Sequence, residues 1–204
     1  MYVYVKRLID VLGSGSLLIV LSPLFMVLCL LNLYYHGSPV LFKQERPGLK
    51  GETFCMLKFR TMTNERDREG KLLPDNNRIT IFGSFLRKTS LDELPELINV
   101  LKGEMSLVGP RPLLKKYMPY YSESEKKRHR VRPGITGYSQ VNGRNTVDWD
   151  ARLSMDVWYV ENMSFWLDIK ILLKTIQTVF KRENVELNRI PDLDDHRSEM
   201  QQEI

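Results

Sequence analysis

The chain begins with a long apolar stretch that a helix breaker interrupts. Residues 17–35 (LLIVLSPLFMVLCLLNLYY) carry no charge, and a helix of this length suffices to span a bilayer. Ser22 and Pro23 lie inside the stretch, where a proline removes a backbone hydrogen bond and collides with the preceding turn. We therefore predict two helical segments that meet at Ser22-Pro23, with the Ser22 hydroxyl bonded to a carbonyl group that the break leaves free.

Basic residues flank this stretch on both sides. Lys6 and Arg7 precede it, while Lys43, Arg46 and Lys50 follow it. The positive-inside rule then puts both ends on the cytoplasmic side. A re-entrant helix, which enters the bilayer, bends and returns to the same face, satisfies the length, the breaker and the charges. A kinked spanning anchor with a short external N-terminus is the alternative, and the pattern alone does not decide between them.

After residue 39 the pattern predicts strands. The β-prone runs 40–46 and 53–62 flank the turn-rich residues 47–52, which indicates a β-hairpin. Lys58 and Arg60 project from one face of the second run and are placed to bind an acidic group together. A solvated strand face, or a salt bridge to a helix, explains Lys58 equally well. The polar residues 64–80 predict a mobile surface loop or lid.

Helical spacing returns after residue 80. Ser90 and Glu93 have the spacing of a capping box, and Pro95 is tolerated close to the first helical turn. Gly103 is expected to end this helix. Its apolar face consists of Leu94, Leu97, Ile98 and Leu101.

A second amphipathic helix is expected over residues 168–182. Its apolar stripe consists of Ile169, Leu172, Leu173, Ile176 and Phe180, and its basic residues are Lys170, Lys174, Lys181 and Arg182. Such a helix either lies in a membrane interface or packs on the core, and the second is the commoner case. The expected fold is a helix-rich α+β domain with a short hairpin. Its expected parts are a re-entrant membrane helix (1–36), a catalytic domain (37–182) and a flexible acidic tail (183–204).

Composition limits the classes of function. The chain has 204 residues, 43% of them hydrophobic, which is enough for one domain with one core. Its formal charge is +5, although residues 183–204 contain seven acids and two arginines, so the remainder is strongly basic. Such charge suits nucleic acid, an anionic membrane or phosphate-bearing substrates. Nucleic acid is excluded as a partner because no recognition motif is present and the apolar stretch is foreign to such modules. Two cysteines, Cys29 and Cys55, predict no structural disulfide and fit a reducing compartment.

The acids near Pro95 have two interpretations. Asp92 and Glu93 at a helix N-terminus gain up to about 1 kcal/mol from the helix dipole, so capping alone explains them. The nearby Arg87 and Arg111 favour a second interpretation, in which the pair holds a divalent metal or supplies a carboxylate nucleophile for phosphoryl chemistry. Arg111 lies in a Gly-Pro-Arg-Pro turn, which presents its guanidinium to a phosphate at little entropic cost.

Residues 131–145 (VRPGITGYSQVNGRN) form a loop-like stretch with three glycines, two arginines and the amides of Gln140, Asn142 and Asn145. Glycines let backbone N–H groups approach an anion, and the amides suit recognition of a base or a sugar. A tight turn without a ligand explains the glycines as well.

Together, five segments resemble the bacterial sugar transferases. Within that family the chain is similar to the small monotopic phosphoglycosyl transferases that start glycoconjugate assembly, such as bacterial N-linked protein glycosylation. The segments are KRLIDVLGS before the apolar stretch, FKQERPG, KFRTM, SLDELPELINVLKGEMSLVGPRP and VRPGITGYSQVNGR, in that order between about residues 6 and 180. The resemblance implies transfer of a phosphosugar from a UDP-sugar to undecaprenyl phosphate at the cytoplasmic face of the inner membrane. The absence of further N-terminal spans is expected of the small subclass.

The resemblance also implies roles for single residues. Asp92 matches the nucleophile that attacks the β-phosphate, expels UMP and holds the phosphosugar as an acyl phosphate. Glu93 completes the dyad, either in metal coordination or in relaying charge and protons, and Mg²⁺ is the implied cofactor, bound by Asp92 and Glu93. Arg87, Arg111 and Arg144 are the phosphate contacts, with Lys58 and Arg60 as weaker candidates. Gln140 and Asn142 are candidates for nucleotide or sugar recognition, and Ser22 and Pro23 would fix the depth of the membrane helix.

A non-catalytic membrane scaffold remains the alternative, because it would keep the apolar helix and the basic surface without needing the dyad. The resemblance is compatible with an N-acetylated or diacetamido hexose, and no residue separates these from a plain hexose. A homodimer is also compatible with exposed membrane helices.

Overall fold

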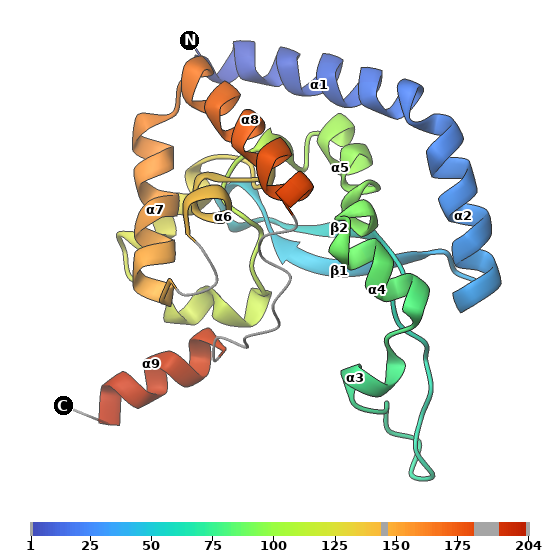
Figure 1. Ribbon diagram of the computed structural model, residues 1–204. Coiled ribbons are helices and arrows are strands. Elements are labelled where there is room, and N and C mark those ends of the chain that lie inside the picture. Colours follow the sequence, from blue (N-terminus) through green and yellow to red (C-terminus); the bar gives the residue numbers. More distant parts are fainter. Residues whose placement is uncertain (1, 144–146, 182–191, 203–204) are drawn as a thin grey trace.

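The computed structural model describes residues 2–143, 147–181 and 192–202 and shows a helix-rich α+β fold (Figure 1). Helices α1 (Tyr2–Val20) and α2 (Ser22–His36) arch over the rest of the protein and are bent by 66° at their junction. The Ser22 hydroxyl donates to the carbonyl of Ile19 at 2.8 Å, so the predicted break and its hydrogen bond are confirmed. No single described helix is long and apolar enough to cross a bilayer, whereas the bent pair together meets that criterion by length and composition.

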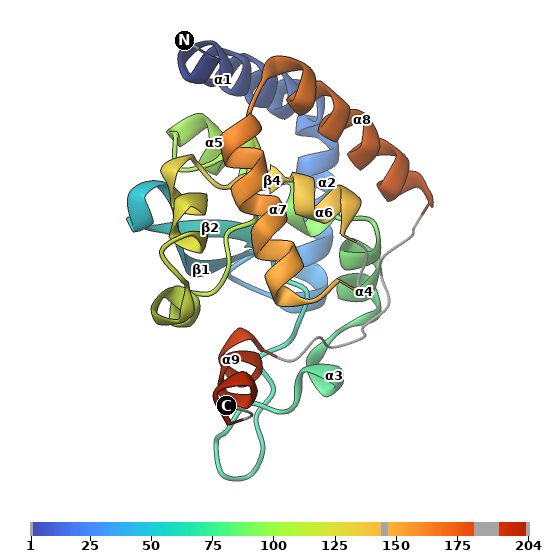
Figure 2. The same ribbon diagram turned by 90° about the vertical axis from the view of Figure 1, so that its left-hand side faces the viewer.

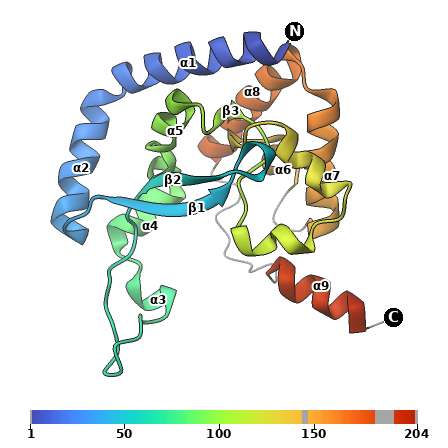
Figure 3. The same cartoon turned by 180° about the vertical axis from the view of Figure 1, so that it is seen from behind.

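The predicted hairpin is also confirmed. Strands β1 (Leu41–Pro47) and β2 (Thr53–Phe59) are antiparallel, with Leu41 opposite Phe59, and they lie at the centre of the fold (Figure 3). A 3₁₀ turn at Leu49–Gly51 joins them. The side chains of Phe59 and Leu28 are buried together, so α2 packs directly against the hairpin.

The next segment leads away from the hairpin and back toward it. Residues 64–74 form an extended excursion, followed by the short helix α3 (Asp75–Arg78) and by α4 (Ile81–Lys88) (Figure 1). The Thr80 hydroxyl caps α4 by accepting from the Gly83 amide at 2.8 Å. Leu86 is fully buried and anchors α4 in the same cluster as Phe59.

The predicted capping box is wrong. Ser90 has left-handed backbone angles (φ 55°), and its side chain makes no capping bond. A 3₁₀ turn, Leu91–Glu93, follows it, and α5 (Glu96–Lys102) begins behind Pro95. The Glu93 carboxylate points to cationic side chains rather than back to the Ser90 amide, because those charges bind it more strongly than a backbone N–H does. Gly103 ends α5 as predicted, with φ 88°.

The stretch 131–145 contains regular structure instead of the expected loop. Strands β3 (Ser106–Val108) and β4 (Gly134–Thr136) pair in parallel, and α6 (Tyr138–Asn142) follows. A Cβ atom on Gly134 would lie 2.1 Å from the Gly109 amide nitrogen. The glycine therefore allows close contact between the two backbones, and it brings the Gly-Pro-Arg-Pro turn against β4.

Two 3₁₀ helices, Lys115–Tyr120 and Glu125–Arg130, precede β4, and α7 (Trp149–Asn162) and α8 (Phe165–Lys181) follow α6 (Figure 2). Helix α8 has two apolar faces: Ile171 is buried, whereas Leu173 and Ile176 are 56% and 55% exposed. Packing on the core thus explains only one of its faces. The side chain of Phe180 lies outside the described residues.

The C-terminal segment includes α9 (Leu193–Gln202), part of the region expected as a flexible tail. Leu193 is fully buried beside Tyr117, and Lys116 bonds to Asp192 and Asp194 at 2.7 and 2.9 Å.

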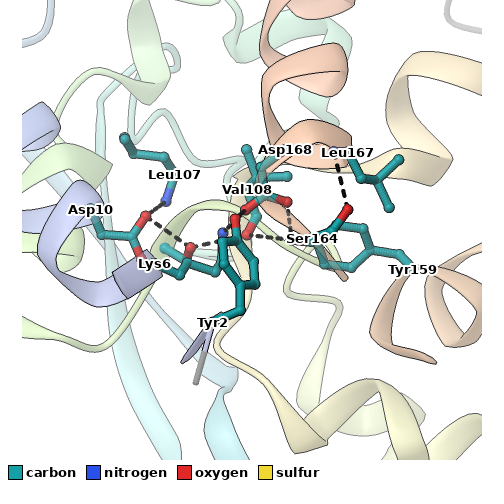
Figure 4. A network of polar contacts seen from close by, with 10 residues as sticks. Tyr2, Lys6, Asp10, Leu107, Val108, Tyr159, Ser164, Leu167 and Asp168 are labelled. Atoms are coloured by element: carbon teal, nitrogen blue, oxygen red, sulfur yellow. Dashed lines mark hydrogen bonds and ion pairs between the residues drawn. The ribbon is translucent and has the colours of Figure 1, made fainter. Parts of the chain in front are cut away.

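A buried polar network ties α1 to the body of the protein (Figure 4). Asp168 of α8 accepts hydrogen bonds from Tyr2 and Tyr159 and pairs with Lys6. Asp10, one helical turn after Lys6, accepts from the Leu107 amide at 2.9 Å. These bonds fix the N-terminal half of α1 against α8 and β3.

Candidate active site

Asp92 lies in the 3₁₀ turn between α4 and α5 and lines a cavity of about 680 Å³, here named the Asp92 cavity. Within the described residues its carboxylate has no hydrogen-bond or ion-pair partner. Burial raises the pKa of Asp92, and the neighbouring charge of Glu93 adds to the rise. The carboxylate is therefore available to react with a molecule in the cavity.

Glu93 has a different environment from its neighbour. Its Oε1 accepts hydrogen bonds from Lys58 at 2.6 Å and from Arg111 at 2.7 Å. Burial alone would raise the pKa of Glu93, but Arg111 and Lys58 outweigh burial and lower it to about 2. Glu93 is thus permanently ionised near neutral pH, which makes it an anchor for two cations and unsuited to relaying protons.

Glu96 is a third carboxylate, to which the sequence assigned no role. It is 2% exposed, and Lys58 Nζ lies 3.2 Å from its Oε1. Burial and the charge of Glu93 raise the pKa of Glu96 to about 7. In the sequence, only the position of Glu96 directly after Pro95, beside the Asp92–Glu93 pair, pointed to this carboxylate. Its burial depends on how α5 packs and could not be predicted.

Arg111 is held by its backbone as well as by Glu93. The carbonyl of Arg111 accepts from Arg128 at 2.7 Å, and Arg128 pairs with the buried Asp156. The charge of Glu93 raises the pKa of Arg111 further above its usual range. The Gly-Pro-Arg-Pro turn therefore presents a fixed guanidinium, as the sequence predicted.

The other predicted cations that the structure describes, Lys58, Arg60 and Arg87, all line the Asp92 cavity. Arg87 Nε donates to the Thr61 hydroxyl at 3.0 Å. Arg60 donates to the carbonyl groups of His36 and Pro39 at 2.9 and 3.2 Å, and it is 8% exposed. Within the described residues Lys58 and Arg60 thus bond to different acceptors, and joint binding of one acidic group stays a prediction.

The residues predicted to recognise a nucleotide or sugar are not gathered around Asp92. Gln140 lines a second cavity, described below. Asn142 accepts from Lys174 at 2.6 Å and donates to the Tyr138 carbonyl at 2.9 Å, so it joins α6 to α8. Arg144 lies outside the described residues.

Arg46 is a cavity residue that sequence reasoning missed. It lies on β1, lines the Asp92 cavity, and donates to Gln44 at 2.6 Å, while its buried Nε has no partner. Burial lowers the pKa of Arg46, and the charge of Arg111 adds to this effect. The only signal in the sequence was its position in FKQERPG, where it was counted as a basic flank of the apolar stretch.

The carboxylates also bear on metal binding. Both oxygens of Asp92 are available, whereas Oε1 of Glu93 is occupied by Lys58 and Arg111. One carboxylate in a cavity open to a diphosphate suits Mg²⁺, which commonly takes one or two carboxylates and completes its shell with phosphate oxygens and water. The residues present fit such an ion, with Asp92 as the first protein ligand.

A second cavity, of about 510 Å³, is also lined by Glu93 and Arg111. Leu17 and Leu21 from the junction of α1 and α2 line it, and it is here named the bend cavity. Ser90, Glu93 and Arg111 line both cavities.

A free, partly buried carboxylate that shares its cavity with several arginines is typical of a site for phosphate-bearing substrates. Residues 1–182 match the family described as bacterial sugar transferase. The chain belongs to this family.

Several relatives are similar over most of the chain. The uncharacterized sugar transferase EpsL of Bacillus subtilis is 51% identical over 181 residues, which cover 89% of this chain and 90% of the relative. The undecaprenyl-phosphate galactose phosphotransferase of Salmonella typhimurium is 40% identical over 88% of this chain. The UDP-glucose:undecaprenyl-phosphate glucose-1-phosphate transferase of Klebsiella pneumoniae is 39% identical over 84% of it. The matched parts are 41% and 39% of these last two proteins, so the chain spans about two fifths of their length.

Proposed function

We propose that the protein transfers a sugar phosphate from a UDP-sugar to undecaprenyl phosphate. The observation that carries this proposal is the free Asp92 carboxylate at a cavity lined by Arg46, Arg87 and Arg111. A diphosphate carries negative charge that these guanidinium groups offset, and they bring its phosphorus atoms to the nucleophile. The names of the Salmonella and Klebsiella relatives state the same acceptor, undecaprenyl phosphate.

In the first step an Asp92 carboxylate oxygen attacks the β-phosphorus of the UDP-sugar. The bond between this phosphorus and the oxygen that bridges it to the α-phosphate breaks, and UMP leaves with that oxygen. The product is an acyl phosphate that joins Asp92 to the sugar phosphate. Covalent catalysis of this kind divides a difficult transfer between two anions into two displacements.

In the second step a phosphate oxygen of undecaprenyl phosphate attacks the same phosphorus. The bond to the Asp92 oxygen breaks, the carboxylate is regenerated, and the lipid leaves as a diphosphate-linked sugar. Glu93 supports both steps by holding Arg111 and Lys58, which stabilise charge on the transferred phosphoryl group.

The acceptor requires a membrane, and the bent pair α1–α2 suits a re-entrant attachment at the cytoplasmic face. Exposed apolar side chains cover its outer side, including Leu12, Ile19 and Leu30 at 61%, 76% and 62% exposure. Ile81 of α4 and Trp166 of α8 are further exposed apolar side chains, at 93% and 72%. Such a surface favours a protein that lies partly in one leaflet.

Bound Mg²⁺ would supply charge neutralisation at the diphosphate and the leaving UMP. Asp92 would hold this ion, and its position at the cavity wall supports this assignment. The guanidinium groups of Arg46 and Arg111 approach the same phosphates from the protein.

The proposal is tested by UMP release from detergent-purified protein over a panel of UDP-sugars, with Mg²⁺ and undecaprenyl phosphate. UDP-galactose and UDP-glucose are included because relatives are named for these sugars, and N-acetylated and diacetamido hexoses because the resemblance is compatible with them. Release that requires the lipid, the metal and Asp92 is expected, and Asp92→Asn should abolish it. If wild type and Asp92→Asn release equal amounts of UMP, the catalytic role fails and a membrane scaffold becomes the better account.

A further inference from the structure

Arg152 of α7 is a cation to which the transfer mechanism above gives no role. Its guanidinium lies over the Trp149 ring at 5.2 Å, and within the described residues it makes no hydrogen bond or ion pair. Asp156, the acid whose charge acts on Arg152, is already engaged, because it accepts from Arg128 at 2.7 Å and from Ser139 at 2.7 Å. A partly buried arginine without an acidic partner indicates a place for an external anion.

Arg152 shares the bend cavity with Arg111. Burial lowers the pKa of Arg152, the charge of Asp156 opposes this effect, and the like charge of Arg111 adds to it. Arg111 is neutralised by one oxygen of Glu93, whereas Arg152 has no such contact. An anion placed between the two guanidinium groups would satisfy both.

The walls of the same cavity are apolar toward the helix bend. Leu17 and Leu21 come from the junction of α1 and α2. Further apolar lining residues are Leu94 and Leu97 from the α5 region, Ile135 from β4 and Val179 from α8. The cavity therefore combines an apolar side at the helix bend with a polar side that holds Arg111 and Arg152. The two acids of this lining, Glu93 and Asp156, are already bonded to Arg111 and to Arg128, so the polar side still suits the anionic head of an amphiphile.

We propose that the bend cavity binds the phosphate of the polyprenyl acceptor, with Arg152 and Arg111 as its cationic contacts and the helix bend covering the first apolar units of the lipid. This inference rests on the proposed function and adds a site to it. Arg46, Arg87 and Asp92 line only the other cavity, which is thereby assigned to the UDP-sugar. The shared residues Glu93 and Arg111 form the boundary across which the lipid phosphate meets the phosphorus held on Asp92.

Two measurements report on the two cavities separately. Exchange of labelled UMP into the UDP-sugar, without acceptor lipid, reports on the Asp92 cavity, and the KM for undecaprenyl phosphate in nanodiscs reports on the bend cavity. Arg152→Ala is expected to raise this KM by about tenfold or more, as for loss of a charged hydrogen bond, and to leave exchange within about twofold. Arg46→Ala is expected to slow the exchange and to leave the KM for undecaprenyl phosphate nearly unchanged. Arg130→Ala, an exposed arginine that lines neither cavity, is the neutral control.

A binding measurement keeps the test independent of turnover. Farnesyl phosphate, a short polyprenyl phosphate, is titrated against the Asp92→Asn variant with and without Arg152→Ala, and thermal stability is recorded. Farnesyl phosphate should stabilise the first variant at concentrations about tenfold lower than it does the double variant. Farnesol should have little effect on either, and inorganic phosphate should act weakly, because each supplies half of the ligand.

The outcomes distinguish this inference from the proposed function. If no UDP-sugar supports transfer by the wild type, but farnesyl phosphate binding depends on Arg152, then the lipid site stands and the transfer reaction fails. If transfer occurs and Arg152→Ala changes neither the KM nor farnesyl phosphate binding, the lipid site is refuted. An equal loss of exchange and acceptor use in Arg152→Ala would also refute it. Arg152→Lys, which keeps the charge, should restore part of the binding and so exclude a loss due to misfolding.

Discussion

The carboxylates Asp92, Glu93 and Glu96 are close in the chain, yet their partners set different protonation states. Asp92 is free and partly buried, Glu93 is held by two cations, and Glu96 is buried beside Lys58. A nucleophile must be ionised, so the acid limb of the pH–rate profile should follow Asp92, whose pKa burial and Glu93 raise. Activity is therefore expected to rise with pH until Asp92 has lost its proton.

Glu93→Gln is predicted to move this acid limb to lower pH. The substitution removes a negative neighbour of Asp92 and releases the charges of Lys58 and Arg111, and both effects lower the pKa of Asp92. The acid limb should therefore lie at a measurably lower pH than in the wild type. The plateau rate should fall by about tenfold or more, because Arg111 loses its anchor. The measurement is kcat/KM for the UDP-sugar against pH, with Glu161→Gln as a control on an exposed acid. An acid limb that does not move in Glu93→Gln would contradict the assignment to Asp92.

Glu96→Gln is predicted to stabilise the protein at alkaline pH only. Because the folded pKa of Glu96 is raised to about 7 from 4.5, the folded state keeps a proton that the unfolded state releases. The free energy of unfolding therefore falls as pH rises from about 4.5 through about 7. At pH 5 the glutamine resembles the protonated acid, so the variant and the wild type should melt together; at pH 8 the variant should melt at a higher temperature. Glu65→Gln, on the exposed excursion, is the control. A melting difference independent of pH would contradict the buried, protonated state.

At the scale of elements, α4 is positioned by a close approach to the end of β2. A Cβ atom on Gly83 would lie 1.9 Å from the Thr61 carbonyl oxygen, and the Thr61 hydroxyl accepts from Arg87. The glycine therefore sets the distance between Thr61 and the helix that carries Arg87, and α4 could not pack here with a larger residue at this position.

Gly83→Ala is predicted to destabilise the protein by about 1–3 kcal/mol and to raise the KM for the UDP-sugar, because α4 and Arg87 must move away from Thr61. Gly15→Ala is the matched control. A Cβ atom there would lie 3.8 Å from Leu101, an ordinary contact, and alanine in a helix interior is favoured over glycine by about 0.5–1 kcal/mol. Thermal unfolding in detergent should thus show opposite signs for the two substitutions. Melting temperatures that change in the same direction would contradict the packing argument.

At the scale of the whole molecule, the confirmed predictions concern features that depend on local backbone chemistry. The break at Ser22-Pro23, the hairpin and the end of α5 at Gly103 follow from backbone chemistry within a few residues, and all three are confirmed. The capping box failed because Glu93 meets Lys58 and Arg111, which are distant in the chain.

Other features could not be predicted from the sequence because they depend on packing between distant segments. The two cavities, the free side chain of Arg152 and the ties from α1 to Asp168 bring together segments that no periodicity connects. Asp92 and Arg111 could be assigned only through their resemblance to a known family, because capping explained the acids equally well. Residue types thus indicated the chemistry, while the partition of residues between two cavities needed the tertiary structure.

The membrane topology is the whole-molecule feature that separates a re-entrant pair from a kinked spanning anchor. The 66° bend and the network that holds Lys6 against Asp168 keep the start of α1 beside the body of the protein. Both Tyr4→Cys and Glu69→Cys, made in a chain with Cys29 and Cys55 replaced by serine, should therefore resist an impermeant maleimide in intact cells and react after permeabilisation. Tyr4 is 84% exposed, so protection of this position in intact cells would reflect its side of the membrane rather than burial. Labelling of Tyr4→Cys but not of Glu69→Cys in intact cells would place the N-terminus outside, and α1 would then have to leave Asp168 to cross the bilayer.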